Sequence, residues 1–148
     1  MGVSTTFSLG VAANAAKIPS RKLRRWLDTN IITLRGNDSK PTGSGTHCGL
    51  SRTRILQAAI TEALLKSGVS LSTATKAAFE FSDFGNAGRA AAQTFPLGKT
   101  ILALGPNGPV VSNVHFDAKL FDISNCGVTI VVDLNKISSD VTAVLDNS

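Results

Sequence analysis

Four stretches in the first 83 residues place apolar side chains at spacings of three and four, a period that predicts helices. The expected helices cover about residues 9–16, 21–28, 52–67 and 71–81. Each follows a serine whose hydroxyl can cap a helix by accepting a backbone N–H: Ser8, Ser20, Ser51 and Ser70. Because Pro19 leaves only a tight turn between the first two helices, they are expected to form a helix-turn-helix.

Between the second and third helices, short apolar runs flank a polar loop. The runs at residues 31–35 and 46–50 are expected to be strands, and residues 36–45, rich in glycine, serine and threonine, to be the loop between them. A strand, a loop and a return strand beside a basic helix are typical of the wing of a winged helix.

After Gly85 and Gly88 the pattern becomes that of a sheet. Strands are expected over residues 100–104, 109–116 and 128–133, with a turn at 105–108, and residues 134–145 have helical spacing. The predicted fold class is therefore α+β: an N-terminal helical winged helix-turn-helix, followed by a small antiparallel sheet with a terminal helix.

This pattern divides the chain into a winged-helix domain at residues 1–83, a joint at 84–94 and a small α+β dimerisation or effector module at 95–148. Residues 128–132 are apolar on both faces, which predicts either a central strand or a strand that pairs between subunits. We therefore expect a homodimer, whose two-fold symmetry would suit paired half-sites.

Charge is distributed unevenly between the two parts of the chain. Residues 1–80 carry eleven Lys or Arg and four acidic side chains, a balance of +7, whereas residues 81–148 carry four and six, a balance of −2; together they give the net charge of +5. A basic half joined to a mildly acidic half indicates a polyanion-binding module attached to a second part with another role.

The second predicted helix is the most basic element. Four of its residues within five positions are cations: Arg21, Lys22, Arg24 and Arg25. Arginine forms bidentate hydrogen bonds with phosphates and with guanine edges, so this helix is expected to bind double-stranded DNA. A solvated charged face is the alternative. Arg52 and Arg54 begin the next helix and are interpreted either as further DNA contacts or as solubilising surface groups. Trp26 is interpreted as a core anchor.

Three short motifs resemble the DNA-binding domain of the MerR family of bacterial transcription regulators. They are Leu23-Arg24-Arg25-Trp26, Asn30-Ile31-Ile32 and Gly68-Val69-Ser70-Leu71, in the order and at the spacing of that domain. The resemblance covers about half of the chain. Arg25 stands where the family usually has tyrosine, and residues 46–50 lack the family's aromatic wing sequence.

The resemblance implies a function and a set of contacts. In the family the second helix enters the major groove, while that helix and the wing hold phosphates. Carried over, this points to the helix cations and, in or beside the wing, to Arg35, Lys40 and His47; Ser20 at the helix start completes the set. The expected function is sequence-specific DNA binding by a cytoplasmic transcription regulator. The sequence does not name a small-molecule effector.

Other chemistry finds little support in the sequence. Cys48 and Cys126 lie far apart without a CxxC motif, and the two histidines lack partners for catalysis or metal binding, so we expect no enzyme activity, cofactor or metal. No apolar run is long enough for a membrane helix. Two alternatives to a regulator remain open: an excisionase-like architectural DNA-binding protein, and an interaction module that binds an acidic protein.

Overall fold

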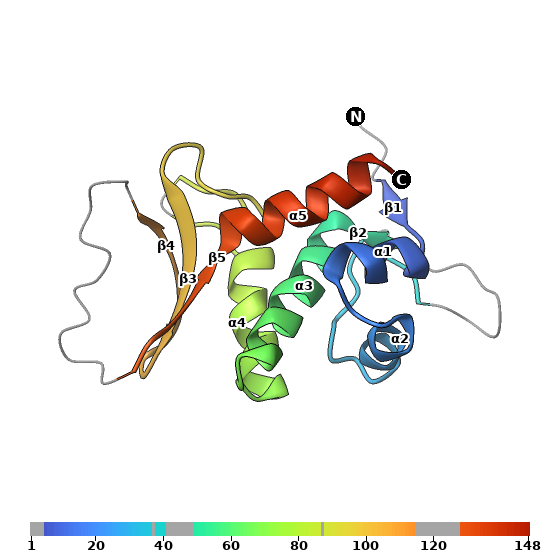
Figure 1. Ribbon diagram of the computed structural model, residues 1–148, viewed down its shortest axis with the longest axis horizontal. Helices are drawn as coiled ribbons and strands as arrows, with labels where there is room; N and C mark the ends of the chain where they lie inside the picture. Colours follow the sequence, from blue (N-terminus) through green and yellow to red (C-terminus); the bar gives the residue numbers. More distant parts are fainter. Residues whose placement is uncertain (1–4, 37, 41–48, 87, 115–127) are drawn as a thin grey trace.

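The computed structural model describes residues 5–36, 38–40, 49–86, 88–114 and 128–148, which form five helices and two small antiparallel sheets (Figure 1). The elements are β1 (Thr6–Phe7), α1 (Leu9–Ala16), α2 (Ser20–Asp28), β2 (Leu50–Ser51), α3 (Arg52–Lys66), α4 (Leu71–Ser82), β3 (Lys99–Gly105), β4 (Gly108–Val114), β5 (Ile130–Asp133) and α5 (Leu134–Asp146). The predicted α+β class, with N-terminal helices followed by a sheet and a terminal helix, is confirmed.

Serine hydroxyls begin three of the helices as predicted. Ser8, Ser51 and Ser70 each accept the backbone N–H of the residue three positions later. Ser20 does not: it is the first residue of α2, whose N-cap is Pro19 without a side-chain cap bond. The reason is that the Pro19 carbonyl already accepts the N–H groups of Lys22 and Leu23, at 3.0 and 3.1 Å. The helix therefore begins one residue earlier than expected.

The predicted strand at residues 31–35 is absent. The N–H groups of Ile31 and Ile32 both donate to the Trp26 carbonyl, at 2.9 and 3.2 Å, and the Ile32 side chain is buried in the core. The β-branched residues therefore close the end of α2 rather than extend as a strand. In the predicted return strand, Leu50 belongs to β2, which pairs with β1 instead. Residues 46–48 lie outside the described residues.

The second sheet has the strand order β4-β3-β5, with antiparallel pairing throughout. Its first two strands form a hairpin closed by Gly105 and Gly108, and Gly108 has φ +99°, a conformation that glycine adopts without strain. The central strand is β3, so the alternative in which residues 128–132 form the central strand is wrong. Prediction of that strand from its apolar run alone could not tell a central position from an edge.

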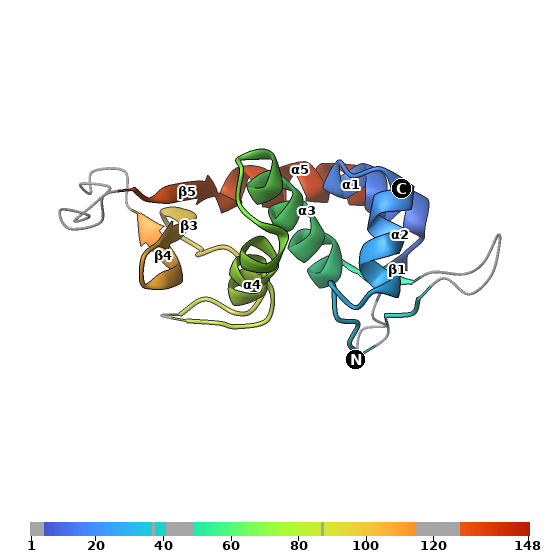
Figure 2. The same cartoon turned by 90° about the horizontal axis from the view of Figure 1, so that it is seen from below.

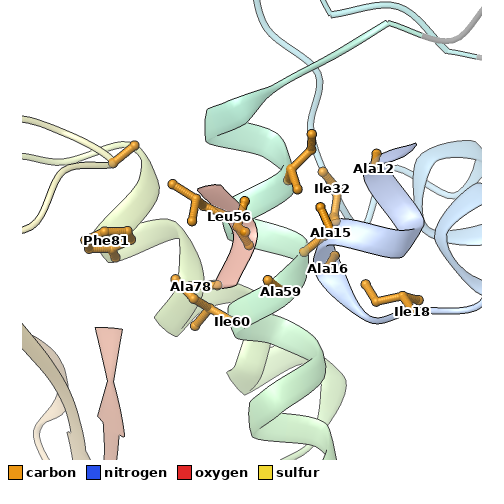
Figure 3. Close-up of a cluster of buried hydrophobic side chains, with 14 of the residues drawn as sticks. Ala12, Ala15, Ala16, Ile18, Ile32, Leu56, Ala59, Ile60, Ala78 and Phe81 are labelled. Atoms are coloured by element: carbon orange, nitrogen blue, oxygen red, sulfur yellow. The ribbon is translucent and has the colours of Figure 1, made fainter. Parts of the chain in front are cut away.

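The core is built around α3, which lies between α1 and α4 (Figures 1 and 3). Leu56 and Ile60 of this helix are fully buried. Figure 3 shows the small side chains of α1 on one side of α3 and those of α4 on the other, among them Ala15, Ala16 and Ala78. Because alanine keeps side chains short, the three helices pack closely.

The terminal helix α5 runs from the sheet to the N-terminal helices. It contacts β3, α3 and α1, and Leu134, Val141 and Leu145 belong to the same buried cluster as the side chains of α1 and α3. Along the long axis of the molecule, the sheet, the α3–α4 pair and the α1–α2 pair follow one another, with α5 beside them (Figure 2). The hydrophobic core thus continues across residues 84–94, while a division into two domains there stays a prediction.

An ion pair network fastens α5 to α1. Asp140 accepts hydrogen bonds from Lys17 at 3.1 Å and from Lys136 at 2.8 Å, and these bonds hold the pKa of its carboxyl below the ordinary value. A carboxylate with a lowered pKa stabilises the fold above its unfolded-state pKa, about 3.9, and loses that contribution as the pH falls through the folded value.

We expect Asp140→Asn to lose less stability than the wild type between pH 7 and pH 3. Urea midpoints at both pH values measure this, and equal losses would contradict it.

Arg89 closes the C-terminal end of α4. It is 5% exposed, and its guanidinium donates to the carbonyls of Phe81, Phe84 and Gln93 at 3.2, 2.6 and 3.2 Å. Burial lowers the pKa of this guanidinium, against the opposing charge of Glu80. The side chain therefore joins one carbonyl in the last turn of α4, that of Phe81, to two carbonyls of the segment that follows the helix, those of Phe84 and Gln93.

We expect Arg89→Met to lower the free energy of unfolding by about 3 kcal/mol, because it removes the guanidinium that donates to the Phe84 and Gln93 carbonyls. Urea denaturation followed by circular dichroism measures the change. The exposed substitution Lys76→Met is the control and should leave the midpoint where it is. A wild-type midpoint for Arg89→Met would show that water replaces the guanidinium at no cost.

Among the residues that the structure describes, no helix combines the length and apolar character needed to cross a bilayer.

Candidate nucleic-acid interface

One side of α2 faces the core and the other faces solvent. Leu23, Trp26 and Leu27 are at most 2% exposed, which confirms the interpretation of Trp26 as a core anchor. Burial of these three positions turns Arg21 and Arg25 outward, and both are exposed. The amphipathic pattern of the helix therefore determines which of its cations can meet a ligand.

Arg24 lies on the same outer side but is only half-exposed. Its Nε is 3.9 Å from the Asp28 carboxylate one turn later. Pairs of this kind on a helix surface contribute about 0.3–0.5 kcal/mol, so the pair with Asp28 is weak. Arg21, Arg24 and Arg25 are spaced by three and four positions and form one cationic strip, which we call the α2 strip.

Lys22 has a different role from its neighbours. Its Nζ lies 2.6 Å from the Glu62 carboxylate of α3 and 5.4 Å from the centre of the Trp26 ring. The Glu62 side chain is only 5% exposed, so its charge depends on this lysine for a partner. Lys22, one of the four predicted helix cations, thus fastens α2 to α3, and the Glu62 carboxylate largely neutralises its charge.

Ser20 lies beside the α2 strip. It occupies the first turn of α2 and is exposed, and its hydroxyl is not used for capping. The N–H groups at this end of a helix carry partial positive charge and attract anions. Ser20 therefore lies at the end of α2 that attracts anions.

The segment predicted to be the wing is described at residues 35–36 and 38–40 and again from residue 49. The Arg35 side chain is 59% exposed; its guanidinium lies 3.6 Å from the Asp83 carboxylate and 5.0 Å from the centre of the Phe79 ring. Lys40 is exposed. A pair of backbone hydrogen bonds between Ser39 and Gly49 joins the two sides of the loop. His47 lies outside the described residues, so its predicted contact stays a prediction.

Arg52 and Arg54 are placed differently from the sequence-based expectation. Arg54 is 2% exposed and bonded to Gln57 and Asp83, so we do not retain it as a DNA contact. Arg52 is half-buried and donates to Ser138 and Thr142 of α5, at 3.1 and 2.6 Å. The start of α3 faces inward because α4 and α5 pack beside it, and a one-dimensional pattern does not contain that information.

Several partners of the cations were not identified from the sequence. Glu62, Asp38 and Asp83 each contact a basic side chain from another segment. The position of Asp83 just after the end of a predicted helix is the one local feature of the sequence that could have drawn attention to it. The Lys22–Glu62 pair spans 40 residues, and no local feature of the sequence indicates it.

Among the described residues, no group of three His, Cys, Asp or Glu side chains is arranged to hold a metal ion. Cys48, Cys126, His47 and His115 all lie outside the described residues. The acidic side chains of the interface are engaged in ion pairs with arginine and lysine.

Comparison with known protein families and with characterised proteins finds no match to this chain.

Proposed function

We propose that the protein binds double-stranded DNA, with the α2 strip in the major groove and the wing residues Arg35 and Lys40 against the phosphate backbone. The observation that carries this proposal is the orientation of α2: its apolar residues are buried, while Arg21 and Arg25 are exposed. The major groove is wide enough for an α-helix, and arginine reads guanine in it through two hydrogen bonds.

The arrangement around α2 supports the same proposal. A left-handed Lys17, with φ 59°, and Pro19 make the tight turn from α1, so α2 begins directly after it. The Lys22–Glu62 pair holds α2 against α3, which gives the α2 strip a fixed base. A preorganised strip loses less conformational entropy when it binds.

The resemblance to MerR-family regulators leads us to propose a sequence-specific transcription regulator that acts in the cytoplasm as a homodimer on paired half-sites. An architectural protein of the excisionase kind would bind DNA with the same surface. A footprint that changes transcription of a linked promoter distinguishes the regulator from the architectural protein.

Selection of bound duplexes from a random pool tests the proposal. We expect enrichment of a defined sequence by the wild type, because direct readout by arginine favours particular bases. Binding without enrichment would favour an architectural role. No retention of any duplex would overturn the proposal, and the acidic-protein alternative would then be preferred.

A further inference from the structure

Three charged side chains are buried together at the base of the wing. They are Asp38 in the predicted loop, Arg54 in the first turn of α3 and Asp83 just after α4, with side chains 1%, 2% and 6% exposed. They come from three separate segments of the chain. Burying charges is costly even when they are paired, and a buried ion pair is often no more stable than an apolar contact of the same size, so this cluster calls for a reason beyond stability.

Arg54 uses its whole guanidinium within the cluster. Its Nε lies 4.0 Å from the Asp38 carboxylate, and its Nη2 donates to Asp83. Its Nη1 donates to the Thr33 carbonyl at 3.2 Å and to Gln57 at 2.6 Å. One side chain therefore contacts the segment before the loop, its own helix and the end of α4.

Asp38 joins the two sides of the wing. One carboxylate oxygen accepts the N–H of Ser51, after the loop, at 2.6 Å, and the other accepts the N–H of Arg35, before it, at 3.0 Å. The next residue, Ser39, forms the backbone bridge to Gly49. The position of the Asp38 carboxylate thus fixes both sides of the wing base, which we define as residues 35, 38–39 and 49–51.

We propose that Arg54 is a positioning residue for the wing: it holds the Asp38 carboxylate, and through it the wing base, against the end of α4. This inference rests on the proposed function in taking DNA as the ligand of the wing. Asp83 also lies 3.6 Å from the exposed Arg35 guanidinium, so the same cluster directs a cation that would meet phosphate.

The cluster also connects the wing to the second half of the chain. Asp83 is the C-cap of α4, and residues 84–94 lead from it to the sheet. Arg54 therefore links the wing base to the point where residues 84–94 leave α4.

Amide hydrogen exchange of the full-length protein tests the positioning role without DNA. In Asp38→Asn, we expect exchange of the Arg35, Gly49 and Ser51 amides to become at least about 10-fold faster, with the Ala74 amide inside α4 unchanged. Arg54→Lys, which keeps the charge but cannot reach all four partners, should show the same pattern. Asp140→Asn is the control, because it makes the same charge change on α5 and should leave the wing base as it is.

Duplex binding supplies the second readout. Asp38→Asn removes a negative charge, and general electrostatics alone would make its affinity for DNA equal to or higher than that of the wild type. The positioning role predicts the opposite change in affinity: Asp38→Asn should bind the duplex about 10-fold more weakly, with a smaller salt dependence and the same selected sequence. Asp140→Asn should bind as the wild type does or slightly more tightly.

Each outcome decides the inference. Exchange at the wing base as slow as in the wild type in both variants would overturn it. So would uniformly faster exchange of all core amides in both variants, because the cluster would then hold the whole fold rather than the wing. Asp38→Asn binding a duplex as tightly as Asp140→Asn would overturn it as well. If the wild type binds no duplex, the proposed function fails, while the exchange pattern still decides whether Arg54 positions the wing.

Discussion

Replacing Arg24 and Arg25 together with glutamine is expected to weaken binding of the selected duplex by about 100-fold. Each bidentate arginine contact contributes about 1–3 kcal/mol of discrimination, and a factor of ten in affinity corresponds to about 1.4 kcal/mol. Both side chains point away from the core, since Leu23, Trp26 and Leu27 occupy the buried side of α2. The double variant gives up the Arg24–Asp28 pair, about 0.3–0.5 kcal/mol, and should remain folded with a urea midpoint close to that of the wild type.

Fluorescence anisotropy with the selected duplex measures this change. The matched control is the double variant Lys99→Gln/Lys136→Gln, which removes the same number of positive charges from the sheet and the start of α5. Figure 1 places that region at the opposite end of the molecule from α2. The control should bind within a factor of about three of the wild type, because screening weakens charges beyond about 10 Å. Equal losses in the two variants would mean that net charge, not the α2 strip, determines binding.

Arg54→Met is expected to lower the free energy of unfolding by about 3–5 kcal/mol, the range measured when one partner of a buried ion pair is removed. The substitution keeps the apolar stem but leaves the buried Asp38 and Asp83 carboxylates without the guanidinium that they share; the exposed Arg35 guanidinium still lies 3.6 Å from Asp83. It also removes the donor to the Thr33 carbonyl. Urea denaturation measures the change.

Lys66→Met, at the exposed last turn of α3, is the control on the same helix and should unfold with the wild type. A second variant, Arg54→Met/Asp83→Asn, removes one of the two stranded charges and should recover part of the loss. If Arg54→Met is as stable as the wild type, the buried carboxylates do not depend on Arg54, and the account of the wing base fails with it.

The helices and the second sheet were predictable because local rules govern them. Ser8, Ser51 and Ser70 cap helices within three residues of themselves, and the apolar spacing of α3 is regular over its whole length. The turn between β3 and β4 was equally clear from Gly105 and Gly108. In each case the interaction that decides the structure lies within one turn or one hairpin.

The wing and the placement of the arginines were not predictable in the same way. The pattern at residues 31–35 fits a strand by composition, but Ile32 is needed in the core beneath α2. Arg54 and Arg25 are the same residue type and both lie in basic stretches, yet one is buried and the other exposed. What separates them is the packing of α4 and α5 against the start of α3, which depends on contacts across 29 and 90 residues.

The most direct test of the central claim is a salt titration of the wild-type protein with the selected duplex. The α2 strip and the wing cations Arg35 and Lys40 predict neutralisation of several phosphates, so the logarithm of the binding constant should fall linearly with the logarithm of the salt concentration, with a slope of about −0.9 for each phosphate contacted. The account predicts a slope of about −3 to −5 per protomer. A binding constant that does not change with salt, or no binding at about 50 mM salt, where phosphate contacts are strongest, would contradict it.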